Sequence, residues 1–195
     1  ITEKITGYEV GYKGVYFDNL FLTLDVYYNQ LKDFITDLGP TGGSIFENGI
    51  RYSVWSYGNA GKVNEYGFEV SSNYYLNEIF TLDANYSYFE FDVVEKGEND
   101  YLLPNSPKFK INGGITYYHQ DGHSVSMKVK HVPTFPWAAG IFRDGEVTAY
   151  TMVNFAGTYQ ITGNLSFNLN ITNLLDNEHF EILGGSLLRR RALAS

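Results

Sequence analysis

Residues 66–88 read YGFEVSSNYYLNEIFTLDANYSY and contain two alternating segments with a short break between them. One row of side chains is Phe68, Val70, Ser72, Tyr74, Leu82, Ala84, Tyr86 and Tyr88. The intervening row is Glu69, Ser71, Asn73, Thr81, Asp83, Asn85 and Ser87. A period of two predicts two β-strands joined by a tight turn at residues 76–79. The apolar row must lie against either a protein core or lipid.

The composition excludes several classes of protein. Of the 195 residues 44% are hydrophobic, but no stretch approaches the ~18–20 apolar residues of a transmembrane helix. The first residues lack the apolar segment of a signal peptide. Cysteine is absent, which excludes disulfides and thiolate metal sites. The net charge of −8 argues against a nucleic-acid partner. The 17 Tyr suit either a membrane–water boundary or strands in general.

The same alternation recurs along the chain and predicts eight complete strands and part of a ninth. Besides the hairpin of residues 66–88, the predicted strands are 6–16, 20–34, 107–118, 123–131, 149–159, 164–172 and an incomplete strand from about residue 187. Several of them hold about ten alternating residues, the length that a tilted strand needs to cross a bilayer.

The predicted connections alternate between short turns and long loops. The long loops are residues 35–56, 94–106, 132–147 and 174–186. Compact soluble domains rarely carry several loops beyond ~12–15 residues, whereas transmembrane barrels have short turns on one side and long loops on the other.

Backbone hydrogen bonding restricts the architecture further, because in lipid only a closed barrel pairs every N–H and C=O group. An odd, unfinished set of strands does not close as a bacterial barrel. We therefore predict an all-β fold: a section of a larger transmembrane antiparallel up-and-down β-barrel, with open edges at both ends. Two alternatives remain. One is a β-propeller, since hairpins recur at roughly 40–50 residues; the other is a soluble β-sandwich that binds a ligand in its loops, as a lectin does.

The C-terminal segment carries a resemblance to a known family. Residues 170–180 read NITNLLDNEHF and are followed by Gly184-Gly185 and Arg189-Arg190-Arg191. This run resembles the end of TonB-dependent outer-membrane receptors. Three upstream pieces are similar to the same family in order and spacing: residues 7–14, residues 59–63 with 67–70, and residues 104–112.

The resemblance covers nearly the whole chain and implies that residues 1–195 are the C-terminal portion of such a barrel. It implies a parent barrel of about 22 strands with a plugged lumen, in the outer membrane of a Gram-negative bacterium. The implied partners are outer-membrane lipid, a small-molecule nutrient and the TonB complex. The nutrient is most commonly a ferric siderophore, with haem, cobalamin and glycan fragments as alternatives. The plug region that engages TonB and the earlier strands are expected outside this chain, which stops at Ser195 before the family's terminal aromatic residue.

Motifs for catalysis or cofactor binding are missing from the sequence. It has no G-x-S-x-G, H-E-x-x-H or phosphate-binding loop, so we predict neither enzyme activity nor a cofactor. His119 and His123 flank a tight turn. Two imidazoles there could hold a metal, but we expect solvated turn residues and no metal site.

Charged residues recur on the polar rows of the strands. They are Glu9, Asp25, Glu69, Asp83, Lys108, Lys110, Lys128 and Lys130. Strand carboxylates could form a general acid–base pair, as in glycosidases. We favour a wet, charged lumen wall that contacts a plug.

Aromatic residues and arginines gather in two of the long loops. We predict ligand contacts from Arg51, Tyr52, Trp55, Tyr57, Trp137 and Arg143. Aromatic rings and guanidinium groups can stack on and clamp an anionic or planar ligand. The alternative is that both Trp residues belong to the outer aromatic girdle or to loop packing.

Overall fold

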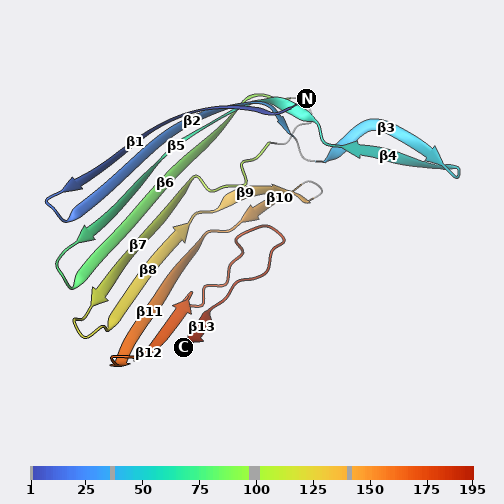
Figure 1. Cartoon of the computed structure of the whole chain (residues 1–195). Coiled ribbons are helices and arrows are strands. Elements are labelled where there is room, and N and C mark those ends of the chain that lie inside the picture. The colour runs from blue at the N-terminus through green and yellow to red at the C-terminus, as the bar shows by residue number, and fades with distance from the viewer. Residues whose placement is uncertain (1, 36–37, 97–101, 140–141) are drawn as a thin grey trace.

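The computed structural model describes residues 2–35, 38–96, 102–139 and 142–195. One sheet has the strand order β1-β2-β5-β6-β7-β8-β11-β12-β13, with every neighbouring pair antiparallel (Figure 1). Its strands are β1 (Lys4–Tyr16), β2 (Leu20–Ile35), β5 (Asn59–Tyr75), β6 (Phe80–Glu95), β7 (Phe109–Tyr118), β8 (Ser124–Val132), β11 (Tyr150–Thr162), β12 (Leu165–Thr172) and β13 (Arg191–Ala194). Among the described residues, no helix is long and apolar enough to span a membrane.

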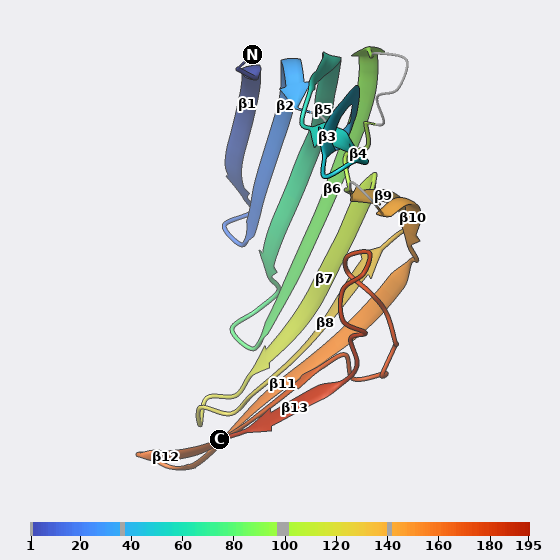
Figure 2. The same ribbon diagram turned by 90° about the vertical axis from the view of Figure 1, so that its right-hand side faces the viewer.

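The sheet is a curved wall with β1 and β13 at its two edges (Figures 1 and 2). Within the described part of the chain, the other two sheets are small hairpins of two strands each. The described residues form neither the face-to-face sheets of a sandwich nor the blades of a propeller, so both alternatives are wrong. The predicted barrel section is confirmed: the strands follow one another in an up-and-down order and form part of a larger barrel wall.

Tight turns join the strands at one end of the sheet and long connections at the other, as predicted (Figure 2). The turn residues explain why the chain reverses there. Phe17 and Asp18 adopt φ angles of 55° and 62°, and Asn77 accepts the backbone N–H groups of Ile79 and Phe80 through Oδ1, at 2.9 and 2.8 Å. Asn side chains form such turns readily because they replace a backbone acceptor.

Apolar side chains share the face of the sheet that we call the outer face. The register pairs Val70 with Tyr86 and Leu82 with Ile115 across neighbouring strands. Outer-face residues stay accessible, with Ile111 45% and Val129 46% exposed. Since the described chain places no second layer against them, these side chains form a common outward belt rather than a dry core.

Two rows of aromatic rings border this aliphatic belt. Towards the long loops, the stacked or tilted pairs are Tyr28–Tyr66, Phe68–Tyr88, Tyr86–Phe109 and Phe109–His131, with ring centroids 5.7–6.3 Å apart. Towards the tight turns, the pairs are Phe80–Tyr117, Tyr117–His119 and His123–Tyr159. An aliphatic band between two aromatic girdles is the lipid-facing surface of a transmembrane barrel.

Buried residues gather at the loop end of the other face, which we call the inner face. One cluster packs Leu102 of the second long connection against Leu31 and Val63. The other packs Phe135 and Val147 of the third connection against three residues of β8 and β11, namely Val132, Tyr150 and Met152. The loops therefore fold back over the inner face of the wall.

Two long connections predicted to be irregular contain hairpins instead. The first holds β3 (Gly39–Glu47) and β4 (Ile50–Ser56), and the third holds β9 (Phe135–Ala139) and β10 (Phe142–Val147). Asn48 and Gly49 turn the first hairpin with φ angles of 51° and 78°. An Asn-Gly pair favours this turn because both residues tolerate positive φ.

The outer face generates a prediction about membrane contact. Met127→Lys places a charge in the aliphatic belt, and we expect it to cost about 2–4 kcal/mol of unfolding free energy, the range for a lysine near the bilayer midplane. Ser126→Lys changes the next residue of β8, on the inner face, and we expect a much smaller cost. Urea unfolding of the full-length protein in lipid vesicles measures both. Equal costs would contradict the lipid-facing assignment.

Candidate functional site

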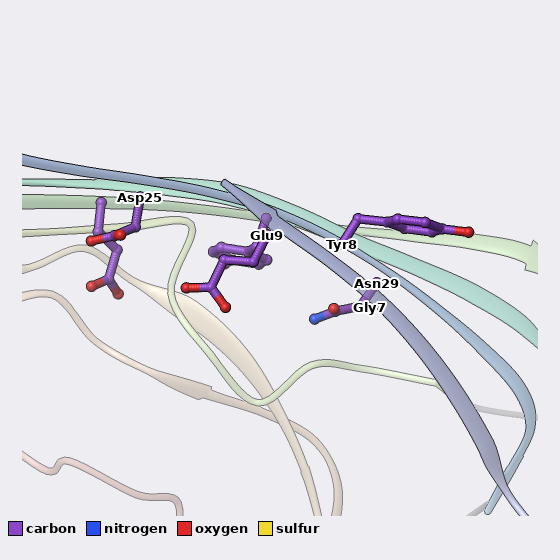
Figure 3. A pocket seen from close by; sticks show the side chains of 7 residues that line it. Gly7, Tyr8, Glu9, Asp25 and Asn29 are labelled. Atoms are coloured by element: carbon purple, nitrogen blue, oxygen red, sulfur yellow. The ribbon is translucent and has the colours of Figure 1, made fainter. Parts of the chain in front are cut away.

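Three carboxylates meet on the inner face at the β1 end of the wall. Asp25 pairs in register with Gly11 on one side and with Glu69 on the other. Together with Glu9 they border a cavity of about 470 Å³, which we call the acidic pocket. Figure 3 shows Glu9 and Asp25 pointing to the side that the sheet encloses.

Glycines on β1 make room for these polar side chains. A Cβ atom on Gly11 would lie 2.6 Å from Oδ1 of Asp25, and one on Gly7 would lie 2.8 Å from Oδ1 of Asn29. The two longer side chains therefore lean across the strand that neighbours them. This is a physical reason for the Gly-x-x-x-Gly spacing in the first strand.

The same arrangement pairs opposite charges in the middle of the wall. Asp83 extends over Gly114, whose Cβ would meet Asp83 Oδ1 at 2.6 Å. On the far side its Oδ1 lies 3.5 Å from Nζ of Lys128, so an ion pair crosses the width of β7. Both groups are accessible, so the pair contributes little to stability. Its consequence is an inner surface with fixed charges.

A second inner-face cavity of about 280 Å³ lies at the loop end, and we call it the loop pocket. Its chemically distinctive lining residues are Lys110, Lys130, Trp137, Tyr150 and Glu181. Lys130 Nζ lies 3.2 Å from Oε1 of Glu181 and 5.6 Å from the centre of the Tyr150 ring. The Tyr150 hydroxyl donates to the same Glu181 oxygen at 3.3 Å. Two ammonium groups with aromatic rings suit a ligand that is anionic and planar.

The loop pocket is built from connections that bind one another. Asn105 of the second connection donates to the carbonyl of Ala138 at 2.7 Å and accepts its N–H at 2.8 Å. In the fourth connection, His179 is 3% exposed and stacks on Tyr150 with ring centroids 4.3 Å apart. His179 Nδ1 donates to the carbonyl of Asn177 at 2.7 Å. The fourth connection is thereby held against the inner face.

The Asn-Leu-Leu-Asp segment starts this fourth connection and fixes its direction. Asn173 is 1% exposed and has a φ of 57°. Its amide group bonds both backbone groups of Asn177, each at 2.9 Å. Its own N–H donates to Oδ1 of Asn154 at 2.9 Å. Buried polar groups need hydrogen-bond partners. An asparagine suits this position because its amide group supplies both a donor and an acceptor.

Asp176 closes the same connection by holding its far end. Its carboxylate accepts the Arg190 backbone N–H at 2.8 Å and an Arg189 guanidinium N–H at 3.2 Å. The backbone hydrogen bond from Arg190, with the charges of Arg189 and Arg190, holds the pKa of Asp176 below its usual range. The last strand therefore begins at Arg191, later than the predicted residue 187, because the residues before it are anchored to the loop.

The structure separates the predicted ligand contacts. Trp137 lines the loop pocket. Arg51, Tyr52 and Trp55 lie on the β3–β4 hairpin, which extends away from the sheet (Figure 1). Tyr57, just after that hairpin, is 67% exposed. Arg143 lies in β10, but its side chain is outside the described residues.

Among the predicted inner-face residues, Lys108 requires a correction. Its Nζ lies 2.9 Å from Oε1 of Glu90, and the Tyr88 hydroxyl donates to the same carboxylate. Tyr88 belongs to the outer aromatic row, so Lys108 reaches the outer face. The reason is that β7 begins only at Phe109, and Lys108 does not follow its alternation.

Sequence reasoning missed Tyr150, Glu181 and the role of His179 in the loop pocket. Glu181 and His179 closely follow the Asn-Leu-Leu-Asp segment, which is a usable signal for a folded loop. Nothing in the local sequence indicates that this loop meets the start of β11.

Comparison with known proteins finds one family of receptors. The sequence model of the family described as "TonB dependent receptor-like, beta-barrel" matches residues 2–174. The probable TonB-dependent siderophore receptor PiuA of Acinetobacter baumannii is 23% identical over 202 residues, covering 91% of this chain and 24% of the relative.

Solved structures agree on the fold. The copper transporter OprC matches with a TM-score of 0.74 and 19% identity, over 98% of this chain and 30% of its own. The pyoverdine receptor FpvA from Pseudomonas aeruginosa PAO1, bound to pyoverdine, matches with a TM-score of 0.74 and 18% identity, over 98% of this chain and 29% of its own. The chain thus spans about a quarter to a third of the length of the proteins it matches.

Asp176 generates a pH prediction. Because its pKa is lowered in the folded loop, its stabilising contribution is complete above the unfolded value of about 3.9 and is lost as the pH falls through the lower folded value. We expect hydrogen–deuterium exchange to show the Arg190 amide protected at neutral pH and released in that acidic window. Asp176→Asn keeps an acceptor without the charge and should show no such step. The same acid release in this variant would contradict the assignment.

Proposed function

The chain belongs to the TonB-dependent receptor β-barrel family, and we propose that it forms the C-terminal wall of an outer-membrane transporter that imports a scarce nutrient. The family's members are outer-membrane proteins of Gram-negative bacteria. The observation that carries the proposal is the family match over residues 2–174. The lipid-facing belt and its two aromatic girdles support it independently. Since the matched proteins are much longer, we assign the plug, its contact with the TonB complex and the other strands of a barrel of about 22 to the rest of the receptor.

We propose a ferric siderophore as the cargo. The matched receptor PiuA is described as a probable siderophore receptor, and FpvA is described as a pyoverdine receptor bound to pyoverdine. The loop pocket supports this class because Lys110, Lys130 and Trp137 offer positive charge and a stacking surface to an anionic, planar chelate. Haem, cobalamin and glycan fragments are the alternatives, and the uptake experiment below distinguishes them.

The acidic pocket has a different role in this proposal. Glu9, Asp25 and Glu69 lie near the edge strand β1, on the side enclosed by the sheet. We propose that they face basic groups of the plug. Asp83 and Lys128 already pair within the wall, so they would contribute shape and hydration more than net charge. No catalytic role is proposed for either carboxylate group.

Uptake by the full-length protein tests the proposed function. A Gram-negative strain that lacks its own siderophore receptors would express the receptor under iron limitation and be supplied with radiolabelled ferric siderophores. We expect accumulation that requires both TonB and the proton gradient. Uptake of haem, cobalamin or glycan instead would replace the cargo assignment. Cargo uptake that is independent of TonB would contradict the transport mechanism.

The loop pocket generates a prediction about affinity. We expect Trp137→Ala to weaken ligand binding by roughly tenfold or more, since aromatic anchors contribute on the order of 2 kcal/mol and 1.4 kcal/mol is a factor of about ten. Trp55→Ala is the matched control on the projecting hairpin and should change the Kd by less than about threefold. Equilibrium binding to the full-length receptor measures both values. A larger loss for Trp55 would move the site to the hairpin.

A further inference from the structure

The tight turn between β7 and β8 brings two histidines and an aspartate together. They are His119, Asp121 and His123, and their candidate ligand atoms all lie within 4.8 Å of one another. The sequence predicts solvated side chains here, and the proposed transport does not use them. We propose that this turn is a binding site for a borderline divalent cation of the Zn²⁺ type.

The backbone holds the two histidines opposite each other. The His119 N–H donates to the carbonyl of His123 at 2.8 Å, and the Gly122 N–H donates to the carbonyl of His119 at 2.9 Å. Gly122 has a φ of +87°, which closes the turn. Because the turn is already formed, a cation would not need to order a flexible segment.

The side chains are close to the spacing that a metal requires. His119 Nδ1 and Asp121 Oδ2 lie 3.3 Å apart, and two ligands at bond lengths of 2.0–2.2 Å around tetrahedral zinc are about 3.3–3.5 Å apart. The rings of His119 and His123 have centroids 5.6 Å apart and an interplanar angle of 30°. His123 therefore lies close enough to His119 and Asp121 to act as the third ligand.

The Nδ1 atom of each imidazole accepts one backbone hydrogen bond, which a metal bound at that atom would replace. The Asp121 N–H donates to Nδ1 of His119 at 3.2 Å, and the Gln160 N–H donates to Nδ1 of His123 at 3.0 Å. The first of these hydrogen bonds is exposed, so water can replace the acceptor, and the second is half-buried. Stacking on Tyr159, with centroids 4.6 Å apart and planes within 6°, keeps the His123 ring beside the turn.

The donor set selects the class of cation. Two imidazoles and one carboxylate suit zinc and similar transition metals, whereas Mg²⁺ and Ca²⁺ prefer a shell of oxygen ligands. The Asp121 side chain is 72% exposed and that of His119 is 37% exposed, so solvent can supply both the cation and a water as fourth ligand. The site lies at the opposite end of the strands from the loop pocket (Figure 1). It is therefore separate from the proposed cargo site.

Zinc binding to the full-length receptor, produced without a histidine tag, tests the site. The protein would be stripped with EDTA, dialysed and titrated with ZnCl₂ by calorimetry. We expect the double variant His119→Gln/His123→Gln to bind one zinc equivalent fewer than the unchanged receptor. Each single variant should raise the Kd at least about tenfold, because loss of even an outer-shell partner costs about 10–100-fold.

The matched control is His131→Gln. His131 lies on the outer face at the other end of β8, and its substitution should leave zinc binding unchanged. Cobalt substitution gives a second readout, since the visible bands of a tetrahedral site should vanish in the double variant, with circular dichroism reporting that the barrel is folded. Equal zinc stoichiometry and Kd in the unchanged receptor and the double variant would overturn the proposal, and so would tight Mg²⁺ binding. Neither result depends on iron uptake.

Discussion

Backbone pairing is the constraint on which the whole structure depends. A wall whose outer face meets hydrocarbon must satisfy every N–H and C=O group through its neighbouring strands. The continuous registers between β1 and β2 and between β2 and β5 show how far the chain meets this demand. In the described nine-stranded sheet, β1 and β13 are the edge strands, and in lipid an open edge is tolerated only where another strand covers it. The need for further strands therefore follows from hydrogen bonding alone, before any relative is considered.

Once the strands are paired, side-chain size decides what the inner face can carry. Gly11 and Gly114 leave space for the carboxylates of Asp25 and Asp83. Glycine normally weakens a strand because it offers no side chain for packing. Here it lets a neighbouring polar group lie across the backbone, and in the case of Asp83 reach the lysine of the next strand. The glycines thus set where the carboxylates lie on the inner face of the sheet.

The sequence was sufficient to predict the nine-stranded sheet because alternation is a local property that each strand carries by itself. It also predicted which end holds the long loops. The hairpin at Asn48 and Gly49 was missed although its turn signal was present. The loop pocket could not be predicted from local sequence patterns. Tyr150 and Glu181 stand far apart in the chain and meet only after the fourth connection folds back. Lys108 was misassigned because alternation holds only within a strand, and β7 begins one residue later.

The two ends of the wall differ in how they are held. At the turn end, backbone hydrogen bonds close the reversals between β1 and β2, between β5 and β6, and between β7 and β8, as between His119 and His123. At the loop end, two buried clusters and the stacked His179 hold the connections, and accessible contacts between them, such as Lys130 with Glu181, individually contribute about 0–1 kcal/mol. Elements held by weak, separable contacts open at low free-energy cost. This combination fits the proposed transport, in which the rim would admit and release a ligand while the wall below stays paired. The loop pocket therefore combines a fourth connection anchored by Asn173, Asp176 and the buried His179 with accessible contacts that separate at low cost.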